Sequence, residues 1–193
     1  MFLKWQTSRD IGTSLKLPFT ISRDHFLGLP GSHLEIVEYG DFQCSHCGEI
    51  YSSMRLLRGH FGDQLRFIFR HYPLPSVHPL SLEAALASEA AALHGRFWEM
   101  HDLIFENQRF LVRSSFSRFA DEIGLNGVPY ANSIGRRKLL NRVLDDFDSG
   151  LQNGVIGTPT LFINGERYNG FLDTENLYDA CGYAIKADLR KSV

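Results

Sequence analysis

Two cysteines separated by two residues, Cys44 and Cys47, are the side chains of this sequence best suited to chemistry. Thiols at this spacing close into a disulfide and open again, so the pair can exchange electrons with other thiols. A strand-like run at residues 34–39 precedes them and a helix-like run follows. If the helix begins at Cys44, its unpaired N–H groups and the positive end of its dipole favour the Cys44 thiolate. The sequence therefore predicts a nucleophile that is active near neutral pH.

His46 lies between the two cysteines. A partly positive imidazole at this position stabilises the Cys44 thiolate, which favours an oxidase or isomerase over a strong reductase. The alternative for the pair is half of a structural zinc site, but the sequence has no second Cys-x-x-Cys motif and no Cys/His pair with zinc-finger spacing. We therefore predict no metal site. The other histidines share no metal-ligand spacing and are assigned no chemistry: His25, His33, His60, His71, His78, His94 and His101.

Glu38 is an acidic residue within an apolar strand. Because side chains alternate between the two faces of a strand, Leu34, Ile36 and Glu38 share one face. A solvated acid at a strand edge is the simpler alternative. The apolar face favours a buried carboxyl group with a raised pKa, which can relay a proton to or from a nearby thiol.

The elements around these residues follow the order strand, turn, helix, strand. Apolar spacing predicts a strand at residues 33–39, a helix that stops at Gly62 and a strand at residues 65–69, so a βαβ unit is complete by residue 72. A helical region follows, with helices predicted at residues 81–94, 96–107, 115–124 and 128–148. The sheet then resumes with a strand at 160–163, a turn at Asn164-Gly165, a strand at 166–168 and a C-terminal helix.

Apolar side chains of these helices are predicted to form the core. Cys181 lies on an apolar stripe of the C-terminal helix, so we predict a small buried residue with no redox role. Six aromatic residues are predicted to pack the helical region: Phe97, Trp98, Phe105, Phe110, Phe116 and Phe119.

Four phrases of the sequence occur together in one protein family. They are Glu38-Tyr39-Gly40-Asp41-Phe42-Gln43-Cys44, Arg70-His71-Tyr72-Pro73-Leu74, Phe97-Trp98-Glu99-Met100-His101-Asp102 and Gly157-Thr158-Pro159-Thr160-Leu161-Phe162-Ile163-Asn164-Gly165. Through them the chain resembles the DsbA-like branch of thiol–disulfide oxidoreductases, in the thioredoxin superfamily. The resemblance spans about residues 34–185.

The resemblance implies an α/β, thioredoxin-like fold with an inserted α-helical subdomain. The thioredoxin-like domain would comprise residues 17–72 and 149–193, and the inserted subdomain residues 73–148. Cys44 would be the attacking cysteine and Cys47 the resolving one, with Glu38 the buried acid beneath them. Pro159 would be a cis-proline facing the disulfide rather than an ordinary turn proline. Substrate contacts are expected at Ser45, Thr158 and Pro159.

Composition excludes several other classes of protein. The 193 residues contain 20 basic and 22 acidic side chains, a formal net charge of −2 that does not favour a nucleic-acid partner. No apolar run approaches the roughly 20 residues of a membrane span. The N-terminal residues lack the apolar region of a secretory signal, so a cytoplasmic location is expected as written, with a periplasmic location as the alternative if the start is trimmed or misassigned.

Together these features predict a thiol–disulfide oxidoreductase that acts on protein or peptide thiols, needs no bound cofactor and exchanges electrons with an unidentified redox partner. One alternative is a redox-inert thioredoxin-fold module that binds peptides or acts as a chaperone. Another is a kappa-type glutathione transferase or isomerase, which uses a serine-like nucleophile and does not need the second cysteine.

Overall fold

The computed structural model describes residues 14–125 and 133–191 of the chain. At its centre is a five-stranded sheet with the strand order β1-β3-β2-β4-β5. The strands are β1 (His25–Leu27), β2 (Leu34–Gly40), β3 (Leu65–His71), β4 (Thr160–Ile163) and β5 (Glu166–Arg167). β2 and β3 are parallel, and the other neighbouring strands are antiparallel. The predicted thioredoxin-like α/β fold is confirmed.

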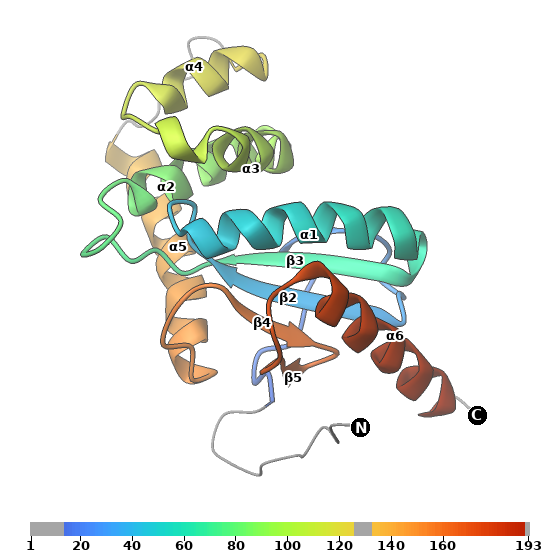
Figure 1. The fold of residues 1–193 in the computed structure, drawn as a ribbon. Coiled ribbons are helices and arrows are strands. Elements are labelled where there is room, and N and C mark those ends of the chain that lie inside the picture. Colours follow the sequence, from blue (N-terminus) through green and yellow to red (C-terminus); the bar gives the residue numbers. More distant parts are fainter. Residues whose placement is uncertain (1–13, 126–132, 192–193) are drawn as a thin grey trace.

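The predicted βαβ unit is present as β2, α1 (Ser45–Phe61) and β3. The apolar stripe of α1, which includes Ile50, Met54 and Leu57, is buried against one face of the sheet. The helix ends where predicted, at Gly62, whose positive φ of 52° is readily adopted only by glycine. Figure 1 shows α1 lying along the sheet above β3.

The two faces of the sheet carry separate cores. Leu34 and Ile36 of β2 face the cluster formed with α1 and α6 (Thr174–Lys191), whereas Val37 and Tyr39 face a second cluster that includes Phe147. Glu38 alternates with the first pair and therefore belongs to the α1 face of the sheet. It is only 1% exposed, so the alternative of a solvated acid is wrong.

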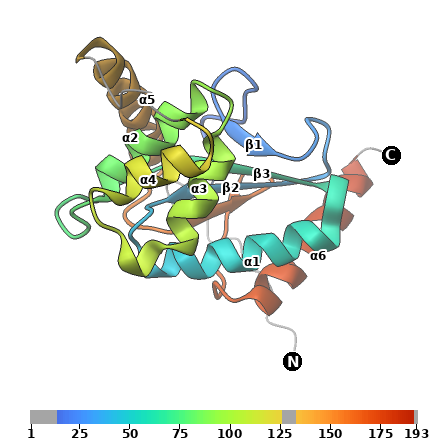
Figure 2. The same ribbon diagram turned by 90° about the horizontal axis from the view of Figure 1, so that it is seen from above.

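The helical insertion comprises α2 (Ser81–Ala92), α3 (Phe97–Glu106), α4 (Ser115–Glu122) and most of α5 (Ser133–Gln152). Helices α2 to α4 gather around the N-terminal half of α1, and α3 lies beside it in both views (Figures 1 and 2). The predicted helices at 81–94, 96–107 and 115–124 are each present with a shorter C-terminal end.

The fourth helix differs from its prediction. It continues to Gln152 rather than ending at residue 148, because its last turns dock on the sheet, where the Tyr39 hydroxyl lies 2.8 Å from Ser149 Oγ. The expected domain boundary at 148/149 therefore falls inside a continuous helix. The predicted start of this helix, residues 128–132, lies outside the described residues.

Two further expectations were incomplete or wrong. Strand β1 was not predicted, because a three-residue edge strand has too little periodicity to recognise; it pairs with β3 from His25 to Leu27. Phe110 does not pack in the helical subdomain, since 80% of it is exposed, whereas the other five aromatic residues are buried or partly buried.

The predicted β4–β5 turn is present. Asn164 and Gly165 have the two positive φ angles that a tight hairpin requires. Among the described residues, no helix has the length and apolar character needed to span a membrane.

Candidate active site

Three segments meet at the N-terminal end of α1. Strand β2 ends at Gly40 and the chain turns into the helix, for which Cys44 is the N-cap residue. The antiparallel register that pairs Tyr39 with Thr160 brings the start of β4 beside this turn. The Thr158–Pro159 loop therefore faces the cysteines, and its peptide bond is cis, as predicted. The Cys44 sulfur lies 3.2 Å from the Thr158 carbonyl oxygen, to which it donates a hydrogen bond when protonated.

Cys44 is in an environment that favours its thiolate. Its pKa is lowered from 9.0 to about 5, most strongly by a hydrogen bond from the Cys47 thiol, and further by the Thr158 side chain and the backbone N–H groups of Cys47 and His46. The helix begins one residue later than expected, at Ser45, which leaves Cys44 as the cap over its free N–H groups. Cys44 is 6% exposed.

Cys47 has the opposite character. It is fully buried, and this burial is the main reason that its pKa lies well above that of a free thiol, with Cys44 and Glu38 raising it further. The Asp41 backbone N–H donates to its sulfur over 3.4 Å. Within one motif the fold therefore favours the thiolate at Cys44 and the protonated thiol at Cys47. All three cysteines of the chain are free thiols in this structure.

Glu38 lies beneath the pair. Burial without a cationic partner raises the pKa of its carboxyl group to about 8, and its Oε1 has no hydrogen-bond partner among the described residues. A hydrogen bond with the Cys47 thiol opposes this rise, so the carboxyl group is in contact with the buried sulfur. At neutral pH the carboxyl group is therefore mostly protonated and can donate a proton to Cys47.

Ser45 and His46 are the exposed residues of the motif. The His46 imidazole lies 3.2 Å from Glu49, whose carboxylate is the main cause of its raised pKa, and the Cys44 thiolate adds to the rise. The structure therefore brings all of the predicted site residues to one end of α1: Glu38, Cys44, Ser45, His46, Cys47, Thr158 and Pro159.

Two polar residues that support the turn were missed by the sequence analysis. The buried carboxylate of Asp41 accepts hydrogen bonds from the backbone of Gln43 (2.8 Å) and Leu74 (2.9 Å) and from His78 Nδ1 (2.8 Å). Gln108, from the insertion, donates to two carbonyl groups of the turn. Asp41 lies within one of the four family phrases and could have been found there. No local signal links Gln108 to residues more than 60 positions earlier.

One group in the described residues combines three potential metal ligands. His25 Nε2 and His71 Nε2 lie 2.8 and 2.9 Å from the same oxygen of Glu89, and all three ligand atoms lie within 4.8 Å of one another. Arg142 Nε lies 3.9 Å from that oxygen. Because this guanidinium already provides positive charge and would repel a divalent cation, we interpret the group as a buried hydrogen-bonded cluster. It joins β1, β3, α2 and α5.

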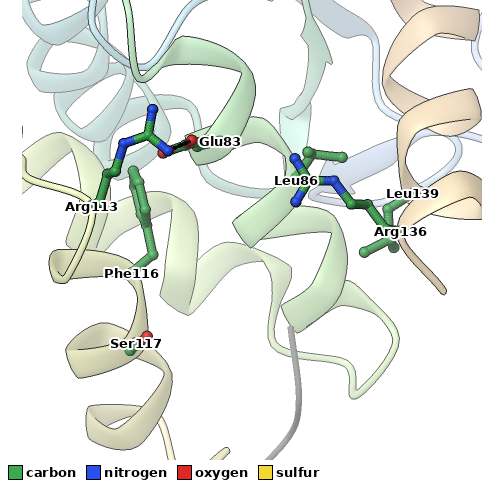
Figure 3. Close-up of a pocket in the computed structure, with 7 residues that line it drawn as sticks. All are labelled: Glu83, Leu86, Arg113, Phe116, Ser117, Arg136 and Leu139. Carbon is green, nitrogen blue, oxygen red and sulfur yellow. Dashed lines mark ion pairs between the residues drawn. The ribbon is translucent and has the colours of Figure 1, made fainter. Parts of the chain in front are cut away.

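A cavity of about 220 Å³ lies within the helical insertion, between α2, α4 and α5. Figure 3 shows Arg113 turned toward Glu83, with which it forms an ion pair, while Arg136 approaches from α5 beside Leu139. None of the predicted site residues lines this cavity. It is therefore separate from the cysteine site.

The family model described as thioredoxin matches residues 20–181. The chain belongs to the thioredoxin family. Among solved structures, α-DsbA1 from Wolbachia pipientis superposes with a TM-score of 0.80 and 19% identity, covering 94% of this chain and 100% of that one. The thiol-disulfide exchange protein α-DsbA2 from the same organism gives 0.71 and 20%, covering 82% and 85%. These thioredoxin-family structures identify the fold as DsbA-like, with its helical insertion.

One relative in sequence is named as a membrane transporter rather than as a thiol–disulfide exchange protein. The Na+/H+ antiporter NhaA 1 of Mycolicibacterium gilvum is 40% identical over 172 residues, which are 88% of this chain and 28% of the antiporter. The chain thus spans little more than a quarter of the length of that relative.

Proposed function

We propose that this thioredoxin-family protein exchanges disulfides with protein or peptide thiols through Cys44 and Cys47. The observation that carries the proposal is the contrast between the two sulfurs, one with a pKa near 5 at the helix N-terminus and the other buried and protonated. A purely structural pair of cysteines has no need for this contrast. Cys44 is also the less buried of the two, as an attacking thiol must be.

The oxidising direction starts from the Cys44–Cys47 disulfide. A substrate thiolate attacks the Cys44 sulfur, a mixed disulfide forms, and Cys47 leaves as a thiolate that takes the proton from the Glu38 carboxyl group. A second substrate thiolate then attacks the substrate sulfur of the mixed disulfide. A substrate disulfide forms, and Cys44 departs as a thiolate. Two electrons thus pass from the substrate dithiol to the protein.

The thiolate environment favours this direction. A thiol with a low pKa is the better leaving group, so the second step releases Cys44 readily. Stabilising the reduced form also makes the disulfide a stronger oxidant, as for the oxidase-type potential of DsbA. We therefore infer an oxidase or isomerase, whose disulfide an external redox partner must regenerate.

The loop opposite the sulfurs is the proposed substrate contact. Thr158 and Pro159 are only partly buried and directly precede β4, so their backbone can pair with an extended peptide held beside Cys44. Ser45 and His46, which directly follow Cys44, are exposed. Because the loop would pair with the main chain of the substrate rather than with particular side chains, it suits a broad range of unfolded substrates.

The antiporter relatives suggest one class of substrate. Since a segment like this chain forms 28% of a protein named as a Na+/H+ antiporter, thiols of a membrane transport protein are candidate partners. A trapping experiment distinguishes membrane proteins from soluble proteins as substrates when the membrane fraction and the soluble fraction are incubated separately with the protein.

The Cys47→Ser variant tests the proposal. Attack by Cys44 remains possible while resolution is lost, so mixed disulfides with substrate proteins are expected to accumulate and to disappear on reduction. Cys44→Ser is the matched control and is expected to trap nothing. Wild-type protein is expected to catalyse insulin reduction. Peptide binding without turnover would instead support the redox-inert module, and glutathione-dependent activity that survives Cys47→Ser would support the kappa-type enzyme.

A further inference from the structure

Gln108 connects the helical insertion to the active-site turn. It belongs to a short 3-10 helix, η2 (Gln108–Phe110), that follows α3. Its Nε2 donates hydrogen bonds to the Phe42 and Cys44 carbonyl oxygens, each over 2.8 Å. Both hydrogens of the amide are therefore used on the two residues that flank Gln43.

The C-terminal end of α3, which directly precedes Gln108, is fixed to α1. The Phe105 ring stacks on Tyr51, with ring centroids 5.3 Å apart, and the Tyr51 hydroxyl donates to Glu106 over 3.0 Å. Phe105 also contacts Phe42 at a centroid distance of 5.0 Å. The Gln108 amide is thus presented from a rigid support, which is what a residue that defines geometry requires.

The carbonyl groups that Gln108 binds control where the Cys44 sulfur lies. The Cys44 carbonyl also accepts the Gly48 N–H over 3.2 Å, which is the first hydrogen bond of the α1 turn. Its position decides whether the sulfur stays over the N–H groups of His46 and Cys47. On the other side, the Asp41 carboxylate holds the turn to the segment around Leu74. The turn is therefore held from two sides.

Gly48 leaves the space that the amide occupies. A Cβ atom at this position would lie 2.5 Å from Gln108 Oε1, which is too close, and 3.3 Å from its Cδ, which is a tight contact. Because the obstacle is the far end of a flexible side chain, alanine at position 48 would displace the amide rather than the helix. The chain thus offers a way to disturb the Gln108 contact without touching Gln108.

We propose that Gln108 is a positioning residue for thiol–disulfide exchange, which holds the turn from Phe42 to Cys44 so that the Cys44 sulfur remains over the first N–H groups of α1. The inference rests on the proposed function for its consequence in catalysis. Its structural part concerns the thiolate alone and can be measured without turnover. Through Gln108, the helical insertion would act directly on the chemistry of the thioredoxin domain.

The test replaces Gln108 with methionine, which keeps the length of the side chain and removes both donors. Ultraviolet absorbance of the thiolate against pH is expected to show the Cys44 midpoint raised by about one unit, a tenfold loss of thiolate at low pH. The equilibrium with glutathione is expected to become less oxidising by a similar factor. Arg109→Met, an exposed neighbour in η2, is the control and is expected to titrate as wild type.

A double-mutant cycle with Gly48→Ala identifies the contact. The substitution is expected to raise the Cys44 midpoint in the wild-type background and to leave it unchanged in Gln108→Met, where no amide remains to be displaced. The single variant Gly48→Ala also measures the effect of a displaced amide on the Cys44 midpoint if Gln108→Met does not fold. An unshifted midpoint in folded Gln108→Met, or an equal effect of Gly48→Ala in both backgrounds, would overturn the proposal. A wild-type protein that is inactive in exchange but shows these shifts would instead remove the proposed function.

Discussion

Glu38 and Glu89 are both buried carboxyl groups, 1% and 4% exposed, yet their pKa values move in opposite directions. Desolvation is the largest influence on each and disfavours the charged form. At Glu38 it prevails and raises the pKa to about 8. At Glu89 it is outweighed by hydrogen bonds from His25 and His71 together with their charge, so the pKa falls well below its usual range.

The difference shows how the surroundings assign a role to a residue type. Glu89 remains charged because partners on three other elements face it, and it therefore ties β1, β3 and α5 to α2. Glu38 faces two thiols and no cation, so it can exchange a proton in the pH range where thiols react. One acid holds the insertion to the sheet, and the other is available for chemistry.

The largest effect on stability is expected from Glu89→Gln. The substitution removes the carboxylate that His25 and His71 share in a buried site, and breaking a buried charged pair typically costs about 3–5 kcal/mol of unfolding free energy. Arg142 keeps its ion pair with Asp146. Chemical denaturation at neutral pH measures the loss. Glu83→Gln is the matched control on the same helix, where the partly exposed pair with Arg113 contributes less than about 1 kcal/mol.

The pH dependence sharpens this prediction. A carboxyl group with a lowered folded-state pKa contributes stability above its unfolded value near 4.5, and this contribution is lost as the pH falls below that value. The difference between wild type and Glu89→Gln is therefore expected to shrink on acidification. A difference that stays constant down to low pH would mean that the Glu89 charge is not what holds the cluster.

Glu38→Gln is expected to have the opposite effect. Because its folded-state pKa is raised from 4.5 to about 8, the favourable contribution of Glu38 is fully present below pH 4.5 and is lost as the pH rises through 8. The variant is therefore expected to be more stable than its parent at high pH, by several kcal/mol at most. Both proteins should carry Cys44→Ser, so that titration of the thiolate does not overlap the measurement. Equal stability of the two across this range would contradict the raised pKa.

The smallest effect is expected at Cys181. This thiol is fully buried, and burial alone raises its pKa to about 12, in contrast to the value near 5 at Cys44. Cys181→Ala is expected to lose about 1 kcal/mol from the smaller side chain and to keep the Cys44–Cys47 potential unchanged. Equilibration with glutathione measures that potential. A changed potential, or loss of a disulfide-linked dimer present in the parent, would identify Cys181 as a third redox residue.

Much of the fold could be predicted because its signals are local. The apolar spacing after Cys47 defined α1, Gly62 ended it, and Asn164-Gly165 set the β4–β5 turn. The misses depend on distant contacts. Strand β1 exists because β3 offers an edge, α5 continues to Gln152 because Ser149 meets Tyr39, and Phe110 faces outward although its residue type favours a core.

By itself, the sequence determined the type of chemistry: two thiols two residues apart, after a strand and at the start of a helix, which is a matter of local chain geometry. It also placed Glu38 on an apolar face. Only the tertiary structure decided that Glu38 lacks a cation while Glu89 has one, and that Gln108 reaches the carbonyl groups beside Cys44. The physical reason is that a pKa depends on desolvation and on partners within a few ångströms, and in a folded chain those partners come from residues far apart in the sequence.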